Sequence, residues 1–182
     1  MRYALLFRGI NVGGKNKIAM ADLVKRVEEL GYRQVETYIN SGNLFFNSEK
    51  PEADIIEGFK AFFAASYPFV RTFALIASKD FAAEELPDWW TDDLVRKDVL
   101  FYTVELDSKM VRKTIEKLKL TDEIVHFGHL GIYWGKYQEK NFLKTAYHKA
   151  LLKQSFYKEI TIRNHKTYAK LADYLGLSHD HL

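Results

Sequence analysis

The order of strand-like and helix-like stretches constrains this fold more than any single motif. Short apolar runs are typical of strands, and apolar residues that recur three and four positions apart are typical of helices. The first half contains strand Tyr3–Phe7, helix Met20–Leu30, strands Val35–Ile39 and Leu44–Phe46, helix Pro51–Phe63 and strand Thr72–Ile76. This order is β-α-β-β-α-β.

The second half repeats the same order of elements. It contains strand Val99–Val104, helix Met110–Leu118, strands Glu123–Phe127 and Ile132–Trp134, helix Phe142–Leu152, strand Ile160–Ile162 and a further helix at Lys166–Leu175. We therefore predict an α+β protein with two tandem ferredoxin-like halves, residues 1–88 and 97–163, followed by a C-terminal helix and tail, residues 164–182. Trp89 and Trp90 in the turn-rich join predict a packed connection.

Composition excludes some classes of protein. The 182 residues are 47% hydrophobic, enough for a buried core in one or two domains. There is no cysteine, which rules out disulfides, thiolate metal sites and a cysteine nucleophile and is compatible with a reducing cytoplasm. Arg8 interrupts the short N-terminal apolar run, and no apolar run reaches about 18 residues. We expect no signal peptide, no membrane association and a cytoplasmic location.

The stretch FRGINVGGKN at residues 7–16 is close to a nucleotide-binding loop. Gly9, Gly14 and Lys15 fit the Walker A pattern, but Asn16 occupies the position of the Ser or Thr hydroxyl that binds magnesium. Such a loop also works with an acidic residue that ends a neighbouring apolar strand, and no such strand is evident. We therefore predict that the protein is not a P-loop NTPase.

The predicted topology gathers polar residues at one end of the first half. In a split β-α-β-β-α-β sheet the end of the first strand lies beside the start of the third, and the fourth strand begins at the same end. The predicted site there comprises Arg8, Asn11, Gly13, Gly14, Lys15, Asn40, Ser41, Asn43 and Arg71. Backbone N–H groups at Gly13 and Gly14, close to a helix N-terminus, favour an anion.

An alternative interpretation needs no ligand at this end of the sheet. Gly13 and Gly14 then only permit positive φ in a tight connection, and residues 40–43 form an ordinary hairpin turn. Both interpretations stay open for the sequence alone.

Arg163 and Asn164 are also candidate ligand-binding residues. Arg163 ends a predicted strand and offers a forked donor to a phosphate or carboxylate, with the start of a helix and Lys166 close by. The alternative is that Asn164 serves only as the N-cap of that helix.

Three stretches together resemble a known family. RGINVGG at residues 8–14, TYINSGNLFF at 37–46 and TIRNHKT at 161–167 are similar to the bacterial family catalogued as domain of unknown function 1697. The resemblance implies an αβ fold and a cytoplasmic bacterial protein, and it implies no established activity. This chain has Ala19 where the family often has proline, and His165 where the family has tryptophan, so a stacking role of that tryptophan is not carried over.

The basic charge lies in the second half of the chain. Residues 91–182 carry a net charge of +4 and residues 1–90 a net charge of −1. Most of the excess is in the basic group Lys136, Lys140, Lys144, Lys149, Lys153, Lys158, Arg163, Lys166 and Lys170. With interleaved aromatic residues, this group offers RNA or single-stranded DNA a surface for charge contacts and stacking. The aromatic residues are Tyr133, Trp134, Tyr137, Tyr147, Phe156 and Tyr157.

No catalytic constellation is visible, so the sequence leaves open whether the protein is an enzyme. We expect no cofactor and no metal site, because His126 and His129 flank a hairpin turn and His179-Asp180-His181 lies in a terminal tail. The leading prediction is a small anionic ligand that carries phosphate or carboxylate. Nucleic-acid binding by residues 136–170 and a non-catalytic role in protein association are the alternatives, and the oligomeric state is open.

Overall fold

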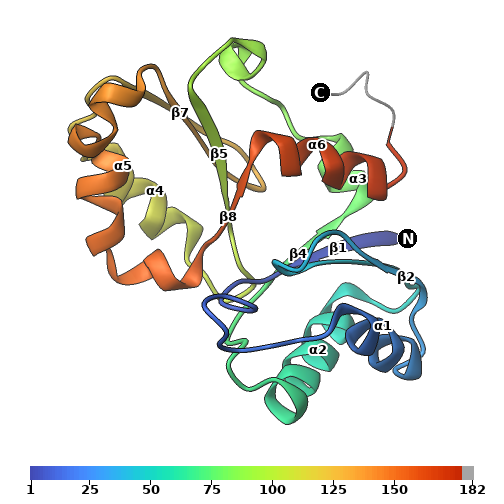
Figure 1. Cartoon of the computed structure of the whole chain (residues 1–182). Coiled ribbons are helices and arrows are strands. Elements are labelled where there is room, and N and C mark those ends of the chain that lie inside the picture. The colour runs from blue at the N-terminus through green and yellow to red at the C-terminus, as the bar shows by residue number, and fades with distance from the viewer. Residues whose placement is uncertain (178–182) are drawn as a thin grey trace.

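Two four-stranded antiparallel sheets form the frame of the molecule, one from each half of the chain (Figure 1). The structure is a computed structural model that describes residues 1–177. The first half contains β1 (Arg2–Leu6), α1 (Met20–Glu29), β2 (Arg33–Thr37), β3 (Asn43–Asn47), α2 (Glu52–Ser66) and β4 (Ala74–Ala77). Its strand order is β2-β3-β1-β4, and every pairing is antiparallel.

The second sheet has the same arrangement. It is built from β5 (Arg96–Phe101), β6 (Glu123–Phe127), β7 (Gly131–Lys136) and β8 (Thr161–Asn164), with α4 (Ser108–Glu116) after β5. The strand order is β6-β7-β5-β8, again antiparallel throughout. The prediction of an α+β protein with strands in both halves is confirmed.

The predicted helix Phe142–Leu152 is wrong as a continuous helix. The chain between β7 and β8 instead forms four short helical segments. They are the 3-10 helices η2 (Glu139–Lys144), η3 (Leu151–Lys153) and η4 (Ser155–Glu159) and the single α-helical turn α5 (Ala146–Lys149). Thr145 has an extended backbone and caps α5, with its hydroxyl accepting the His148 N–H at 3.3 Å. The buried Glu123 carboxylate accepts the N–H groups of Ala146 and Tyr147, the two residues that follow Thr145. These side-chain acceptors start a new turn in the middle of the predicted helix.

The connection between the halves is packed, as its tryptophans indicate. A short helix α3 (Ser78–Ala82), which the sequence did not predict, is followed by the turn η1 (Asp88–Thr91). Trp90 is buried, with its ring 5.2 Å from the Tyr133 ring and 5.5 Å from the Tyr168 ring, both in edge-on contact. These contacts tie the connection to the second sheet and to the last helix.

Three apolar layers hold the elements together. Helices α1 and α2 cover one face of the first sheet, and α4 and α5 cover the outer face of the second (Figure 1). The third layer lies between the two sheets and includes α3 and α6 (His165–Tyr174). Along β1, Tyr3 and Leu5 face the α1–α2 layer while Ala4 and Leu6 face the layer between the sheets. Because both faces of β1 are buried from Tyr3 onward, residues 3–6 form an unbroken apolar run.

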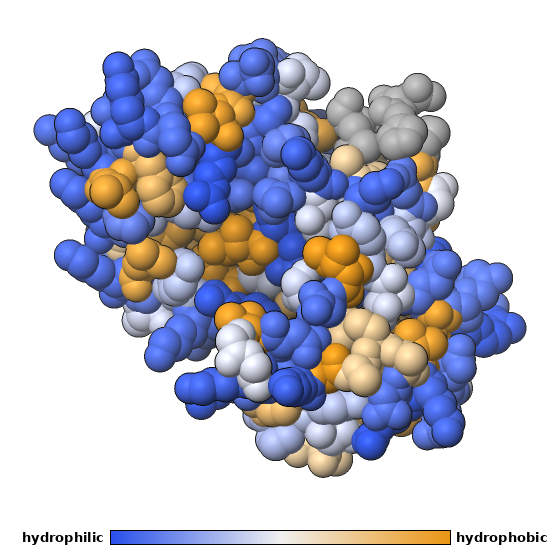
Figure 2. All heavy atoms as spheres, viewed as in Figure 1, coloured by the Kyte–Doolittle hydropathy of each residue, from blue (hydrophilic) through white to orange (hydrophobic). Residues whose placement is uncertain are grey.

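Figure 2 shows hydrophilic residues over most of one face, with hydrophobic residues in small groups. None of the helices within residues 1–177 is both long and apolar enough to cross a lipid bilayer.

Candidate functional site

Arg163 lies buried where the two halves meet, with 7% of its surface exposed. Its Nε donates to Asn43 Oδ1 at 2.6 Å, and its Nη2 donates to the carbonyl oxygens of Phe7 at 2.8 Å and Gly42 at 3.0 Å. Its Nη1 donates to Thr161 Oγ1 and to the Ile162 carbonyl, both at 2.9 Å. All five N–H groups of the guanidinium therefore have acceptors inside the protein.

These contacts give Arg163 a structural task. It holds the hairpin turn between β2 and β3 against β8 and so joins the two halves. Burial, and then the charge of Arg8, lowers the pKa of Arg163 to about 10. Asn164 caps α6, with its Oδ1 accepting the Thr167 N–H at 2.9 Å, as the capping alternative predicted.

The predicted residues of the hairpin turn also bond within the protein. Asn43 is buried and donates from Nδ2 to the Tyr38 carbonyl at 3.1 Å. Ser41 accepts a longer bond from Asn43 at its hydroxyl. Asn11 donates to the Asn40 carbonyl at 2.9 Å, which ties the glycine loop to the hairpin turn. The sequence was therefore right to place these loops together.

The Gly13–Gly14 stretch is a tight turn away from the helix. Val12 and Lys15 form a bridge across it, with the Lys15 N–H donating to the Val12 carbonyl at 3.0 Å. Both glycines have positive φ, 57° and 74°, as the alternative interpretation required. Residues 15–19 separate the turn from the start of α1 at Met20. An anion at these glycines would gain little from the dipole of α1, since that effect fades within one helical turn.

Three positively charged side chains from separate elements line one hollow of about 250 Å³. Arg8 follows β1, Arg71 precedes β4, and Lys158 lies in η4 of the second half. Arg8 is held in place, because its Nη1 donates to the carbonyls of Tyr157 at 2.8 Å and Ile160 at 3.1 Å. Its guanidinium also lies over the Tyr157 ring, 5.0 Å from the ring centre.

None of these three side chains is neutralised by the described protein. Within residues 1–177, no carboxylate lies within 4.0 Å of the charged groups of Arg8, Arg71 or Lys158. The buried cation of Arg163 lies close enough to Arg8 for the two charges to oppose each other. The structure thus gathers positive charge at this junction without an internal counter-ion.

A second hollow of about 260 Å³ adjoins the first, since both are lined by Arg71, Thr72 and Lys158. Its other lining residues are Thr103, Glu105, Ser155 and Glu159. Thr72 Oγ1 is buried, and no hydrogen-bond partner for it exists in the described part of the chain. A buried hydroxyl left unpaired costs about 1–3 kcal/mol. We call the two hollows together the inter-half cleft.

The structure brings two of the predicted site residues, Arg8 and Arg71, into this cleft, along with Gly9. It does not bring Lys15, Asn11, Gly13, Gly14 or the residues of the hairpin turn to the cleft lining. Sequence reasoning missed Thr72 in this role, and it placed Lys158 in the nucleic-acid surface. The adjacency of Arg71 and Thr72 in the sequence was the only signal for Thr72.

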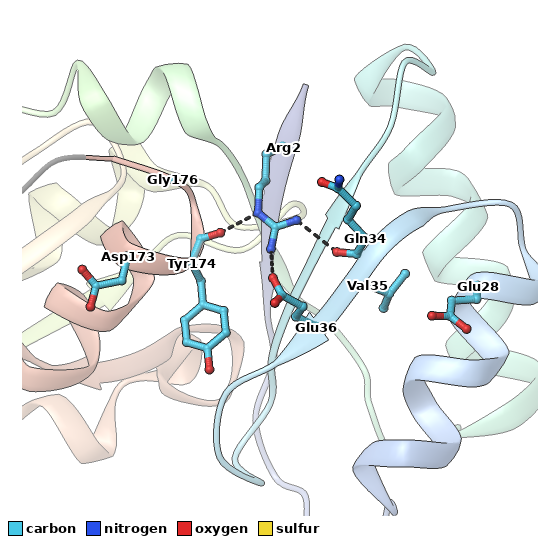
Figure 3. A pocket seen from close by; sticks show the side chains of 8 residues that line it. All are labelled: Arg2, Glu28, Gln34, Val35, Glu36, Asp173, Tyr174 and Gly176. Atoms are coloured by element: carbon cyan, nitrogen blue, oxygen red, sulfur yellow. Dashed lines mark hydrogen bonds and ion pairs between the residues drawn. The ribbon is translucent and has the colours of Figure 1, made fainter.

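A larger, more open hollow of about 670 Å³ lies between the end of α6 and strand β2 (Figure 3). Arg2 spans it, donating to the carbonyls of Tyr174 and Gln34 and forming an ion pair with Glu36. The other charged lining residues, Glu28 and Asp173, are acidic. Arg2 therefore fastens α6 to the first sheet, and the acidic rim does not suit an anion.

The basic group of residues 136–170 contains both buried and exposed side chains. Lys136 is only 2% exposed, with its Nζ 3.4 Å from the centre of the Tyr147 ring and 4.0 Å from Asp98 Oδ2. Burial is the main cause that lowers its pKa to about 8. Four of the aromatic residues proposed for stacking are buried, namely Tyr133, Trp134, Tyr147 and Phe156. Those rings cannot stack on bases, and Lys136 and Arg163 are not surface charges.

Metal ligands do not cluster in the described residues. Among residues 1–177, no group of three or more His, Asp and Glu side chains has the arrangement of a metal site. The backbone N–H of His129 donates to Glu84 at 2.9 Å, which docks the turn between β6 and β7. The His179-Asp180-His181 stretch lies outside the described residues.

Comparison with known proteins places this fold in a family. The family described as "Protein of unknown function (DUF1697)" matches residues 1–133. The chain belongs to this family. It is also similar to the solved structure of the conserved bacterial protein SP0830 from Streptococcus pneumoniae, with 55% sequence identity and a TM-score of 0.94. The match covers 96% of this chain and 98% of that one.

The family match ends at residue 133, within the second half. The match to the solved structure covers nearly the whole chain. Among curated proteins no significant match was found. The family and the neighbour establish the fold, and the chemistry of the site has to be argued from its residues.

Proposed function

We propose that the protein consists of two ferredoxin-like halves and binds a small phosphate- or carboxylate-bearing ligand in the inter-half cleft. The observation that carries this proposal is the convergence of Arg8, Arg71 and Lys158 without a carboxylate partner. Like charges held together oppose each other and raise the free energy of the empty cleft, and an anion between them removes that cost.

The strand order supports the ferredoxin-like part of the proposal. Each sheet has the antiparallel order expected of a β-α-β-β-α-β unit, with the first strand in the centre beside the third and fourth. In the first half, Leu6 at the end of β1 pairs with Ala74 at the start of β4. Arg8 and Arg71, just beyond those two residues, therefore lie at the same end of the sheet.

The three cations differ in what they offer a ligand. A guanidinium presents a planar fork that matches the two oxygens of a carboxylate or phosphate, whereas a lysine acts as a mobile point charge. The side chains of Arg71 and Lys158 are exposed and make no hydrogen bond within residues 1–177, so they are free to reorient toward a ligand. The Arg8 side chain is already fixed by hydrogen bonds to two backbone carbonyls. Binding a ligand therefore costs little further side-chain entropy at Arg8.

Titration calorimetry with inorganic phosphate at low ionic strength tests the proposal. Arg71→Ala and Lys158→Ala should each weaken phosphate binding by about 10-fold or more, because a charged hydrogen bond contributes about 1.5–3 kcal/mol. Lys153→Ala is the matched control, since Lys153 is exposed in η3 but does not line the cleft.

A second comparison separates the cleft from the glycine turn. Lys15→Ala should bind phosphate as the unaltered protein does, because Lys15 lies on the Gly13–Gly14 turn and not in the cleft lining. If Lys15→Ala lost phosphate binding while Arg71→Ala kept it, the anion site would belong to the glycine turn. Absence of phosphate and of carboxylate binding by the unaltered protein would refute the proposed function.

A further inference from the structure

We infer that the ligand of the inter-half cleft is a zwitterion, a small molecule that carries an ammonium group in addition to its phosphate or carboxylate. This inference rests on the proposed function and adds the chemical class of the ligand. It follows from the way in which charge changes sign along the cleft.

The hollow beside Arg8 has only positive charges in its lining, namely Arg8, Arg71 and Lys158. The adjoining hollow keeps Arg71 and Lys158 and adds two carboxylates, those of Glu105 and Glu159. One end of the cleft is therefore cationic, and the other end contains both signs of charge.

The two carboxylates are not equivalent. Glu105 binds Lys60 at 3.0 Å, so part of its charge is already neutralised. Glu159 has no cation within 4.0 Å of its carboxylate in the described chain. Its backbone is fixed, because its carbonyl accepts the Thr103 hydroxyl at 2.6 Å. Glu159 thus offers an exposed carboxylate without a cation partner, carried on a fixed backbone, at the mixed end of the cleft.

Thr72 lies where the two ends meet, since it lines both hollows. A ligand long enough to reach from Arg8 past Thr72 comes into contact with the region of Glu159. Beside the Glu159 carboxylate, a second anionic group would be repelled, and an apolar group would displace water from the carboxylate without replacing its hydrogen bonds. An ammonium group would form an ion pair with it.

The net charge of the lining agrees with this class of ligand. Three cationic and two anionic side chains line the cleft and leave a net charge of +1. A phosphate monoester with an ammonium group carries a net charge close to −1 at neutral pH, which complements the lining more closely than a bare phosphate monoester does.

Titration calorimetry with three probes tests the inference. Inorganic phosphate measures the anion site alone, ethyl phosphate adds an apolar arm, and 2-aminoethyl phosphate adds the ammonium group on an arm of similar size. We expect 2-aminoethyl phosphate to bind about 5-fold more tightly than ethyl phosphate, an ordinary effect for one partly shielded ion pair.

Substitution at Glu159 locates the preference. Glu159→Gln should remove the preference for 2-aminoethyl phosphate while it leaves the affinity for ethyl phosphate unchanged or slightly higher. Glu29→Gln, at an exposed acidic residue of α1 far from the cleft lining, should retain the preference. A preference that survives in Glu159→Gln would contradict the assigned ammonium site.

The outcomes distinguish this inference from the proposed function. Equal affinity for ethyl phosphate and 2-aminoethyl phosphate, with phosphate binding still dependent on Arg71, overturns the zwitterion and leaves the anion site intact. Failure of all three probes to bind overturns both.

Discussion

Arg163 and Asn43 are 120 positions apart in the chain, and a hydrogen bond of 2.6 Å joins the Nε of the arginine to the Oδ1 of the asparagine. The same guanidinium bonds the carbonyls of Phe7 and Gly42, so one side chain of the second half organises the turn and strand end of the first. No carboxylate within the described residues pairs with it. Backbone carbonyls, the Asn43 amide and the Thr161 hydroxyl therefore accept all the hydrogen bonds that stabilise this buried cation.

This geometry should make the stability of the fold sensitive to substitution of Arg163. Arg163→Met should lower the free energy of unfolding by about 3 kcal/mol or more, because several buried acceptors lose their donors. Arg163→Lys should be nearly as harmful, since an ammonium cannot reproduce the planar fork. Urea unfolding followed by circular dichroism gives the values, with Lys166→Met as an exposed control. A stable Arg163→Lys protein would show that charge alone suffices.

Lys136 should make stability depend on pH in the alkaline range. Its pKa falls from the usual 10.5 to about 8 in the folded protein, so between these values the unfolded chain holds a proton that the folded chain has released. The contribution of Lys136 to stability should therefore rise with pH from about 8 to 10.5, by up to about 1.4 kcal/mol per pH unit. Below pH 8 the buried ammonium is protonated and its desolvation cost is fully present.

The comparison of Lys136→Met with the unaltered protein isolates this effect. The variant should lack the alkaline rise when urea unfolding is measured at pH 7.5 and pH 9.5. Lys140→Met, at an exposed lysine of η2, should keep it. Identical pH profiles for the Lys136 variant and the unaltered protein would mean that Lys136 titrates normally.

Glu84 should anchor the second hairpin turn as Arg163 anchors the first. Its two carboxylate oxygens accept the N–H groups of His129 at 2.9 Å and Leu130 at 2.8 Å. Glu84→Ala leaves both N–H groups without this partner and should lower the free energy of unfolding by about 1–3 kcal/mol. Glu85→Ala, at its exposed neighbour, should change the value by less than about 0.5 kcal/mol. Similar losses in the two variants would argue against the anchor.

Two glycines with positive φ should respond differently to alanine. At Gly42, φ is 95° and an added Cβ would lie 2.3 Å from the carbonyl oxygen of Phe7. At Gly13, φ is 57° and an added Cβ would meet nothing within 4 Å. Gly13→Ala should cost about 1 kcal/mol from backbone strain alone, and Gly42→Ala clearly more because the strand end must also move. Thermal unfolding of both variants measures the difference. Equal losses of stability would mean that the positive φ angle alone causes the cost and that the contact with Phe7 does not matter.

The sequence determined the order of the strands and of helices α1, α2, α4 and α6, because periodicity is a local property of the chain. It also predicted that Arg8 and Arg71 share one end of the first sheet, since antiparallel neighbours bring the end of one strand to the start of the next. The caps at Asn164 and the turns at residues 13–14 and 40–43 followed from local backbone chemistry in the same way.

Only the tertiary structure decided which charged residues are exposed and which are buried. Lys136 and Arg163 are basic residues in the same stretch as the exposed Lys153 and Lys166. Packing against Phe142 and Tyr147 within the second half removes Lys136 from water, and packing against the first half buries Arg163. The broken segment at residues 142–152 has the same origin, because Glu123 from a distant strand supplies acceptors that compete with a continuous helix. The cleft itself joins Arg8 to Lys158 across 150 positions of sequence. Local patterns carry no information about such contacts, since desolvation and long-range packing depend on how distant segments of the chain meet.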